Sequence, residues 1–143
     1  LEAYMQKNVD KDFKASDFII RESEEGSTTS NLIVLDMRLN VNGVPTRNFG
    51  YRVRCINKKA ALITFIGEKN PDFDITKAGV QKLSDEDAKK MALAVDNNNY
   101  HVEKQTVFRY FDMQELKQKC EVETMYAYNG GTTFVSAHSF DAE

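Results

Sequence analysis

Residues 33–41 read IVLDMRLNV, and every second residue of this stretch is apolar. The positions between them include the polar residues Asp36, Arg38 and Asn40. A period of two is typical of a β-strand with one buried face and one mostly solvated face. The stretch therefore predicts a strand of a sheet that is covered on one side.

Two more strands are predicted directly after this one. The segment Asn42-Gly43-Val44-Pro45 has the composition of a turn. Apolar residues then alternate again, at Phe49, Tyr51, Val53 and Cys55. The segment 60–66 is apolar on both faces, so we expect it to be the most buried strand of the sheet. Short turns between consecutive strands favour antiparallel pairing.

The N-terminal part of the chain predicts a helix followed by a short strand. Five apolar residues recur at spacings of three or four, as on one face of a helix: Leu1, Tyr4, Met5, Val9 and Phe13. The segment 18–20 reads as a strand, and the polar segment 24–30 predicts an exposed loop or a wide hairpin turn.

A second helix is predicted from Ser84 to about Val95. Ser84 can cap the first free amides of the helix, and the acids that follow suit the positive end of its dipole. The expected buried stripe consists of Ala88, Met91, Ala92 and Val95.

The last third of the chain predicts a strand, a short helix and a hairpin. The strand covers 102–111, and Asp112 resembles a helix N-cap. The inner face of this short helix would hold Met113, Leu116 and Cys120. Strands over 122–128 and 132–140 flank Asn129-Gly130-Gly131, which has the composition of a tight hairpin turn.

This order of elements indicates the α+β class. We expect one domain over 1–143, with a curved, mostly antiparallel sheet of five to seven strands and two or three helices packed on one face.

Charge and hydropathy narrow the function classes. A formal charge of −3 argues against a nucleic-acid binder, which would carry a clustered positive excess. The apolar runs are far shorter than the roughly 20 residues that span a bilayer, so no membrane span is expected. The first residue is Leu1 rather than Met, which suggests processing or truncation and favours a location outside the cytoplasm. The sequence does not indicate an oligomeric state.

The two cysteines, Cys55 and Cys120, fit no CxxC motif. Three alternatives stay open for them: small buried hydrophobic residues, one disulfide, or a reactive thiol. A zinc site together with His101 and His138 is not expected, because none of the four has a closely spaced partner ligand.

No catalytic residue, metal or cofactor is assigned from the sequence. It contains no phosphate-binding glycine loop and no HExxH, GxSxG or EF-hand spacing. His138 and Ser139 are adjacent on a predicted strand and would point to opposite faces. Glu68, Asp72 and Asp74 could bind calcium or act as acid–base groups, but a solvated connection whose charges keep it soluble is the favoured explanation.

The outer face of the predicted second hairpin carries the strongest candidate site. A turn centred on Pro45 would set Arg38 opposite Arg52 and Asp36 opposite Arg54. Arg47 would lie near the turn. Guanidinium groups bind carboxylates in a planar fork, so this face is a candidate docking surface for an acidic partner protein.

Aromatic residues are concentrated in the last third of the chain, and strand alternation leaves some of them exposed. The sequence therefore predicts an interaction or accessory domain that binds another protein through its sheet face or its C-terminal hairpin. A small-ligand or lipid pocket between sheet and helices is one alternative. An enzyme with a dispersed site, using His101 or His138 as its acid–base group, is the other.

Overall fold

The computed structural model describes residues 1–27 and 31–143 and has an α+β fold. Its elements run in this order: α1 (Glu2–Asn8), β1 (Phe18–Ser27), β2 (Leu32–Val41), β3 (Val44–Ile56), β4 (Lys59–Ile66), α2 (Asp85–Asp96), β5 (His101–Asp112), β6 (Lys117–Tyr128) and β7 (Thr132–Asp141). Short 3-10 turns lie at Ala15–Asp17 and Ile75–Lys77. The predicted class, the mostly antiparallel sheet and the predicted numbers of strands and helices are confirmed.

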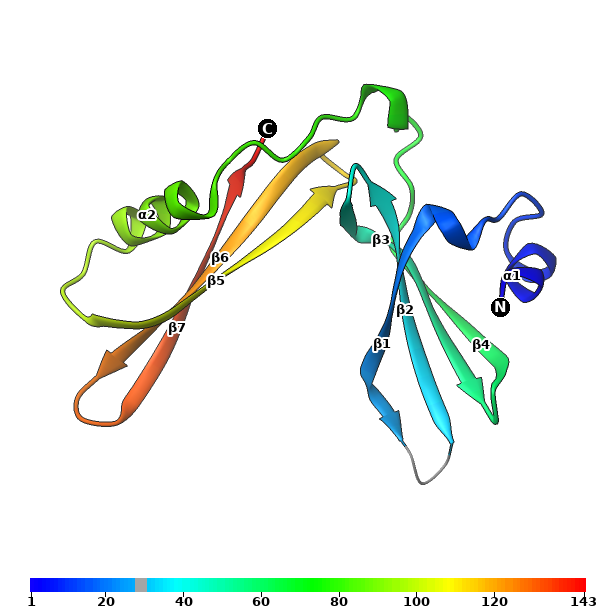
Figure 1. Ribbon diagram of the computed structural model, residues 1–143, viewed down its shortest axis with the longest axis horizontal. Helices are drawn as coiled ribbons and strands as arrows, with labels where there is room; N and C mark the ends of the chain where they lie inside the picture. Colours follow the sequence, from blue (N-terminus) through cyan, green and yellow to red (C-terminus); the bar gives the residue numbers. More distant parts are fainter. Residues whose placement is uncertain (28–30) are drawn as a thin grey trace.

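The seven strands form one open sheet in the order β1-β2-β3-β5-β6-β7, with β4 also paired to β3. Strand β3 divides one of its edges between two partners: β4 pairs along residues 50–56, and β5 meets it at the Thr46–Phe111 pair. That contact between β3 and β5 is parallel, whereas the other pairings are antiparallel. The sheet bends sharply at this junction, so that β1–β4 and β5–β7 form two arms (Figure 1).

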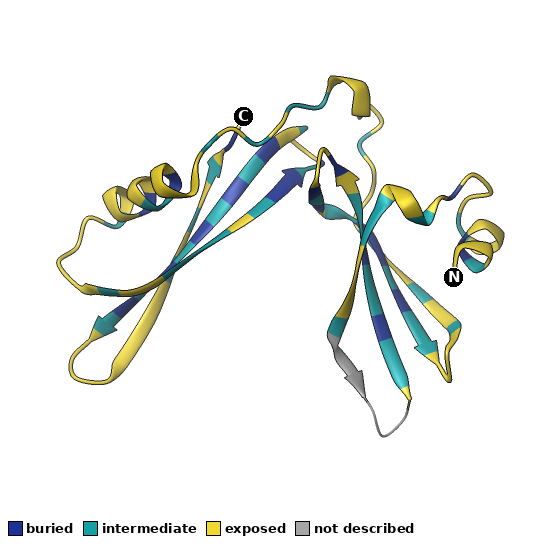
Figure 2. Ribbon diagram, in the orientation of Figure 1, coloured by how far each residue is buried: buried dark blue, intermediate teal, exposed yellow. Residues whose placement is uncertain are grey.

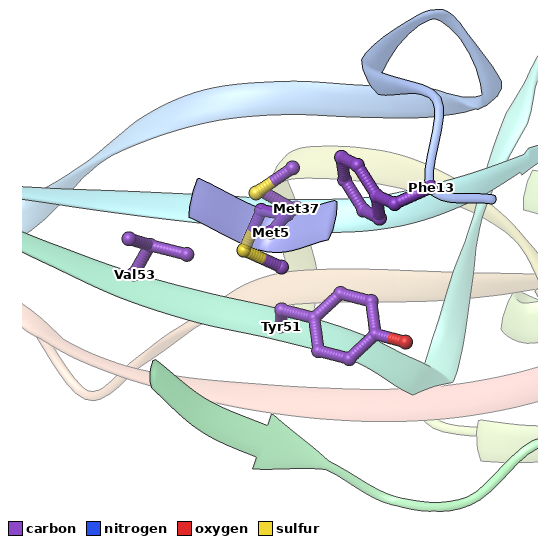
Figure 3. Close-up of a cluster of buried hydrophobic side chains, with 5 residues drawn as sticks. All are labelled: Met5, Phe13, Met37, Tyr51 and Val53. Atoms are coloured by element: carbon purple, nitrogen blue, oxygen red, sulfur yellow. The ribbon is translucent and has the colours of Figure 1, made fainter. Parts of the chain in front are cut away.

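The first arm is held by a core between α1 and the sheet. Met5 and Phe13 are buried beside three side chains of β2 and β3: Met37, Tyr51 and Val53 (Figure 3). Tyr4 and Val9 pack against the same cluster, as predicted. Leu1, which we placed on the buried stripe, is exposed because it precedes the first helical residue.

The second arm is covered by α2. Ser84 caps this helix as predicted, since its hydroxyl accepts a hydrogen bond from the Asp87 amide at 3.1 Å. Ala88 and Ala92 are buried against Cys120 and Val122 of β6. The buried stripe predicted for this helix was too wide, because only its two small alanines lie directly against the sheet. Met91 and Val95 flank that contact line and are exposed.

A third cluster fills the bend. Val41, Val44, Phe111 and Met113 are buried there, and Phe73 packs edge-to-face on Phe111 at 5.7 Å. Both helices lie on the outer side of the bend, and buried residues concentrate along the strands near them (Figure 2). The inner faces of the two arms are therefore turned toward each other.

Three sequence-based assignments need correction. The predicted helix after Asp112 is a tight turn: the Asp112 carboxylate accepts hydrogen bonds from the Gln114 and Glu115 amides, both at 2.9 Å. Leu116 has a φ of 57°, which ends any helical continuation. Cys120 consequently lies on a strand.

The segment 60–66 is an exposed edge strand rather than the most buried one, because β3 is the one strand that pairs with β4 among the described residues. Strand β1 continues to Ser27, into the predicted loop over 24–30. The remainder of that predicted loop, 28–30, lies outside the described residues.

Candidate functional site

An open cleft of about 930 Å³ lies between the two arms, lined by residues of β1, β2, β3, β5 and β6 and by Asp85 at the start of α2. Four arginines and four acids line it together with aromatic and aliphatic residues: Arg21, Arg38, Arg47, Arg109, Asp36, Asp85, Glu121, Glu123, Phe108, Tyr110, Ile19, Val44 and Val107. The lining therefore combines charge of both signs with an apolar floor, which suits a polar, extended ligand.

The wall formed by β1, β2 and β3 carries the predicted arginines. Its register differs from the expected one: Asp36 lies opposite Arg52, and Arg38 lies opposite Gly50. The turn is centred on Asn42-Gly43 instead of Pro45, and a register shift follows between Arg38 and Asn40. The net error is two residues, an even number, so all of these side chains keep the predicted face.

Pairing with β1 adds a residue that the sequence did not suggest. Arg21 lies opposite Asp36 and therefore shares its side of the sheet. We call the four residues Arg21, Arg38, Arg52 and Arg54 the arginine face. Among the described side chains of this face, Asp36 is the one carboxylate.

Asp36 is the electrostatic centre of the arginine face. Its carboxylate accepts from Arg38 Nε at 2.7 Å and from Arg52 Nη2 at 3.4 Å. Burial raises the pKa of Asp36, but the hydrogen bonds and positive charges of the two guanidinium groups outweigh it and hold that pKa below its usual value. Arg38 and Arg52 therefore do not face each other directly as predicted but share the carboxylate of Asp36 between them.

The other two arginines of this face are not held by Asp36. Arg54 donates to the Thr64 hydroxyl at 3.0 Å, and Arg21 is exposed. Their guanidinium groups keep donors that can reach a carboxylate of a partner.

Arg47 joins the two arms instead of extending the arginine face. Its guanidinium pairs with Glu121 of β6 at 3.2 Å and lies over the Tyr110 ring, 3.7 Å from the ring centre. Arg38 also donates to the Arg47 carbonyl oxygen. Arg47 therefore links the arginine face to the opposite wall, where Phe108 is exposed.

Sequence reasoning missed a polar cluster on the outer face of the second arm. Asp96, near the end of α2, contacts His138 Nε2 at 2.5 Å and accepts from the Ser136 hydroxyl at 2.7 Å. The Tyr126 hydroxyl donates to its other oxygen. The spacing of Ser136 and His138 was the available signal, because residues two apart on a strand share a face.

The geometry of this cluster anchors α2 to β6 and β7. His138 Nε2 faces both Ser136, at 3.0 Å, and Asp96. A nucleophile relay needs the serine on one ring nitrogen and the carboxylate on the other. Burial and, to a smaller extent, the hydrogen bond to Asp96 raise the pKa of Tyr126 to about 12. The phenol therefore stays protonated and continues to donate.

The remaining candidate residues lie apart from the cleft. His101 is exposed at the start of β5. Both cysteines are free; Cys120 is buried, as predicted, while Cys55 is only half-buried. In the acidic loop, Asp74 caps the 3-10 turn Ile75–Lys77 by accepting from the Thr76 amide and hydroxyl.

Two comparisons with known proteins, one with family models and one with curated sequences, found no match. Within the described residues, no helix is both long and apolar enough to cross a membrane.

Proposed function

We propose that this chain is an interaction domain that binds an acidic segment of another protein in the cleft, through the arginine face. The observation that carries the proposal is a row of guanidinium groups on one wall: Arg21 and Arg38 line the cleft, and Arg52 and Arg54 continue the same face of the sheet. Guanidinium groups form bidentate hydrogen bonds with carboxylates, so an acidic segment would offer further carboxylate partners, above all to Arg21 and Arg54.

The shape of the cleft supports a peptide-like partner. It is open to solvent, is lined by residues of several strands, and includes the exposed aromatic ring of Phe108. Aromatic and arginine side chains are the commonest energetic anchors of protein interfaces. A partner segment with acidic residues near an apolar one matches this arrangement.

The alternatives have weaker support. Lipid and small-ligand pockets are lined mainly by apolar side chains, whereas eight charged residues line this cleft. An enzyme would use His138, but that imidazole shares one nitrogen between a serine and a carboxylate. A specific observation favours a second docking surface on the C-terminal hairpin. Tyr100 is exposed, and the centre of its ring lies 5.4 Å from the ring centre of Tyr128 and 5.4 Å from that of Phe134.

Nuclear magnetic resonance can test the proposal and separate the two surfaces. Isotope-labelled protein is titrated with a short polyglutamate peptide, and with a polyglutamine peptide as the uncharged control. We expect polyglutamate alone to shift the amide signals of β1, β2 and β3 around Arg21, Asp36 and Arg54. Shifts confined to the C-terminal hairpin, or equal shifts with both peptides, would contradict the proposal.

A further inference from the structure

A buried glutamine spans the bend between the two arms. Gln118 of β6 is fully buried. Its Nε2 group donates to the carbonyl oxygens of Val41, at the end of β2, and of Gly79, in the linker between β4 and α2, both at 3.1 Å. Its Oε1 atom accepts from Gln81 of the same linker at 2.9 Å. These three bonds fix the orientation of the side-chain amide and join β6 of the second arm to β2 of the first.

The linker is also bonded to the first arm. Asn42, in the turn between β2 and β3, donates from Nδ2 to the Gly79 carbonyl oxygen at 2.8 Å and to the Ala78 carbonyl oxygen at 3.1 Å. The Gly79 carbonyl therefore accepts one hydrogen bond from each arm. We call Asn42, Gln118 and this carbonyl the clasp.

The clasp lies on the outer side of the bend, where the linker between β4 and α2 also runs (Figure 1). Gln118 shares its face of β6 with Cys120 and Val122, because residues two apart on a strand point the same way, and α2 covers that face. Arg47 and Glu121 join the arms on the side of the cleft. A tether on the outer side of a bend resists closing, whereas a tether on the inner side resists opening.

The clasp is the stronger directional connection of the two. The side chains of Arg47 and Glu121 are 42% and 25% exposed, and water and salt weaken ion pairs of this kind. Removing Gln118 would instead take a hydrogen-bond donor from the fully buried Val41, which is costly. The apolar cluster at the bend also holds the arms together, but hydrophobic contact is non-directional and does not by itself fix an angle.

We infer that the clasp sets the angle between the two arms and holds the cleft open. Without the clasp, the contact between β3 and β5 would still join the arms, but the arms could turn toward each other. That a partner segment enters the open cleft rests on the proposed function. The angle itself is a property of the free chain, so it can be measured without any partner.

Residual dipolar couplings of the backbone amides test the inference, because they report how two parts of a molecule are oriented relative to each other. Gln118→Met removes the amide of the clasp and keeps a long, unbranched side chain. Gln105→Met is the matched control. The Nε2 group of Gln105 donates to the Lys89 carbonyl oxygen at 3.2 Å and to the Thr124 hydroxyl at 3.1 Å, and both of these partners belong to the second arm.

The wild type and Gln105→Met should each need one alignment tensor for β1–β4 and β5–β7 together. Gln118→Met should need separate tensors for the two arms, and small-angle X-ray scattering should show a more compact chain as the arms close. The inference would be overturned by a wild type that already needs two tensors, by a common tensor in Gln118→Met, by a more extended Gln118→Met chain, or by equal loosening in both variants.

A second variant keeps the inference testable if Gln118→Met does not fold. Asn42 is exposed and has a φ of 53°, which glycine adopts readily, so Asn42→Gly keeps the turn and removes the other half of the clasp. This variant should also need separate tensors, and a common tensor in it would overturn the inference. None of these measurements uses a peptide, so failure of the proposed function would leave their results unchanged.

Discussion

At the scale of single residues, one buried methionine ties the N-terminal helix to the sheet. Met5 has 0% exposure and lies among Phe13, Met37, Tyr51 and Val53. Its unbranched side chain fills the space between the helix and the strands. The stability of the first arm should therefore depend strongly on this one side chain.

Replacing Met5 with alanine should lower the free energy of unfolding by about 2–5 kcal/mol, because it removes buried apolar contacts and leaves a cavity. Leu1→Ala is the matched control next to the same helix: Leu1 is 44% exposed, and its truncation should cost no more than about 0.5 kcal/mol. Denaturant unfolding measures both. Equal losses in the two variants would contradict the assigned packing of α1.

Asp96 should make the stability of the chain depend on acid pH. Burial raises its pKa, but hydrogen bonds from Ser136, Tyr126 and His138 outweigh it and lower that pKa below the ordinary value of 3.8. A lowered carboxyl pKa stabilises the folded state above the ordinary value, and this contribution is lost as pH falls through the folded-state pKa.

The Asp96→Asn variant isolates this contribution. The difference in unfolding free energy between wild type and variant should be largest near neutral pH and should shrink as the pH falls below 3.8. Urea unfolding at a series of pH values measures this difference. A difference that does not change with pH would mean that the Asp96 charge does not anchor α2.

At the scale of elements, short sequence motifs correctly predicted the helix ends and turns that depend on neighbouring residues alone. Ser84 and the acids after it located the start of α2, and Asn129-Gly130-Gly131 located the last hairpin turn. The short helix expected after Asp112 failed because the spacing of Met113, Leu116 and Cys120 also fits a turn followed by a strand. The alternating burial along β6 continues from Gln118 and is the dominant pattern.

Substituting the cap of α2 should show how much this local signal contributes. Ser84→Ala removes the acceptor for the Asp87 amide and should destabilise the chain by about 1 kcal/mol. Ser84→Asp keeps an acceptor at the same place and should restore most of that stability. Thermal unfolding followed by circular dichroism compares the two. Identical behaviour of both variants would contradict the capping role.

At the scale of the whole molecule, sequence periodicity gave the class of the fold but not the bend. Strand alternation correctly predicted the face on which each arginine lies. The predicted register was wrong by two residues, but a shift by an even number of residues leaves every side chain on the same face. The parallel contact of Thr46 with Phe111 joins residues far apart in the chain, so local patterns carry no information about it. The cleft, the bridging role of Arg47 and the exposure of β4 all depend on that contact.

The structure also changes which variants can test the arginine face. Arg38 and Arg52 both bind Asp36, so reversing their charges would set three carboxylates close together and disturb the fold. Arg54 bonds to Thr64, and Arg21 is exposed opposite Asp36, so glutamine at both positions removes the two charges without setting a second carboxylate against Asp36. Lys11 and Lys14 are exposed on the connection between α1 and β1 and allow a control with the same change in net charge.

The most direct test of the central claim compares the affinity of these variants for a fluorescent polyglutamate peptide. The Arg21→Gln, Arg54→Gln double variant should bind at least about tenfold more weakly than wild type, a loss of about 1.4 kcal/mol. The Lys11→Gln, Lys14→Gln double variant should bind like wild type, and wild-type affinity should fall as salt rises. Equal weakening of both variants would show that net charge alone governs binding, and unchanged affinity in the arginine variant would place the docking surface elsewhere.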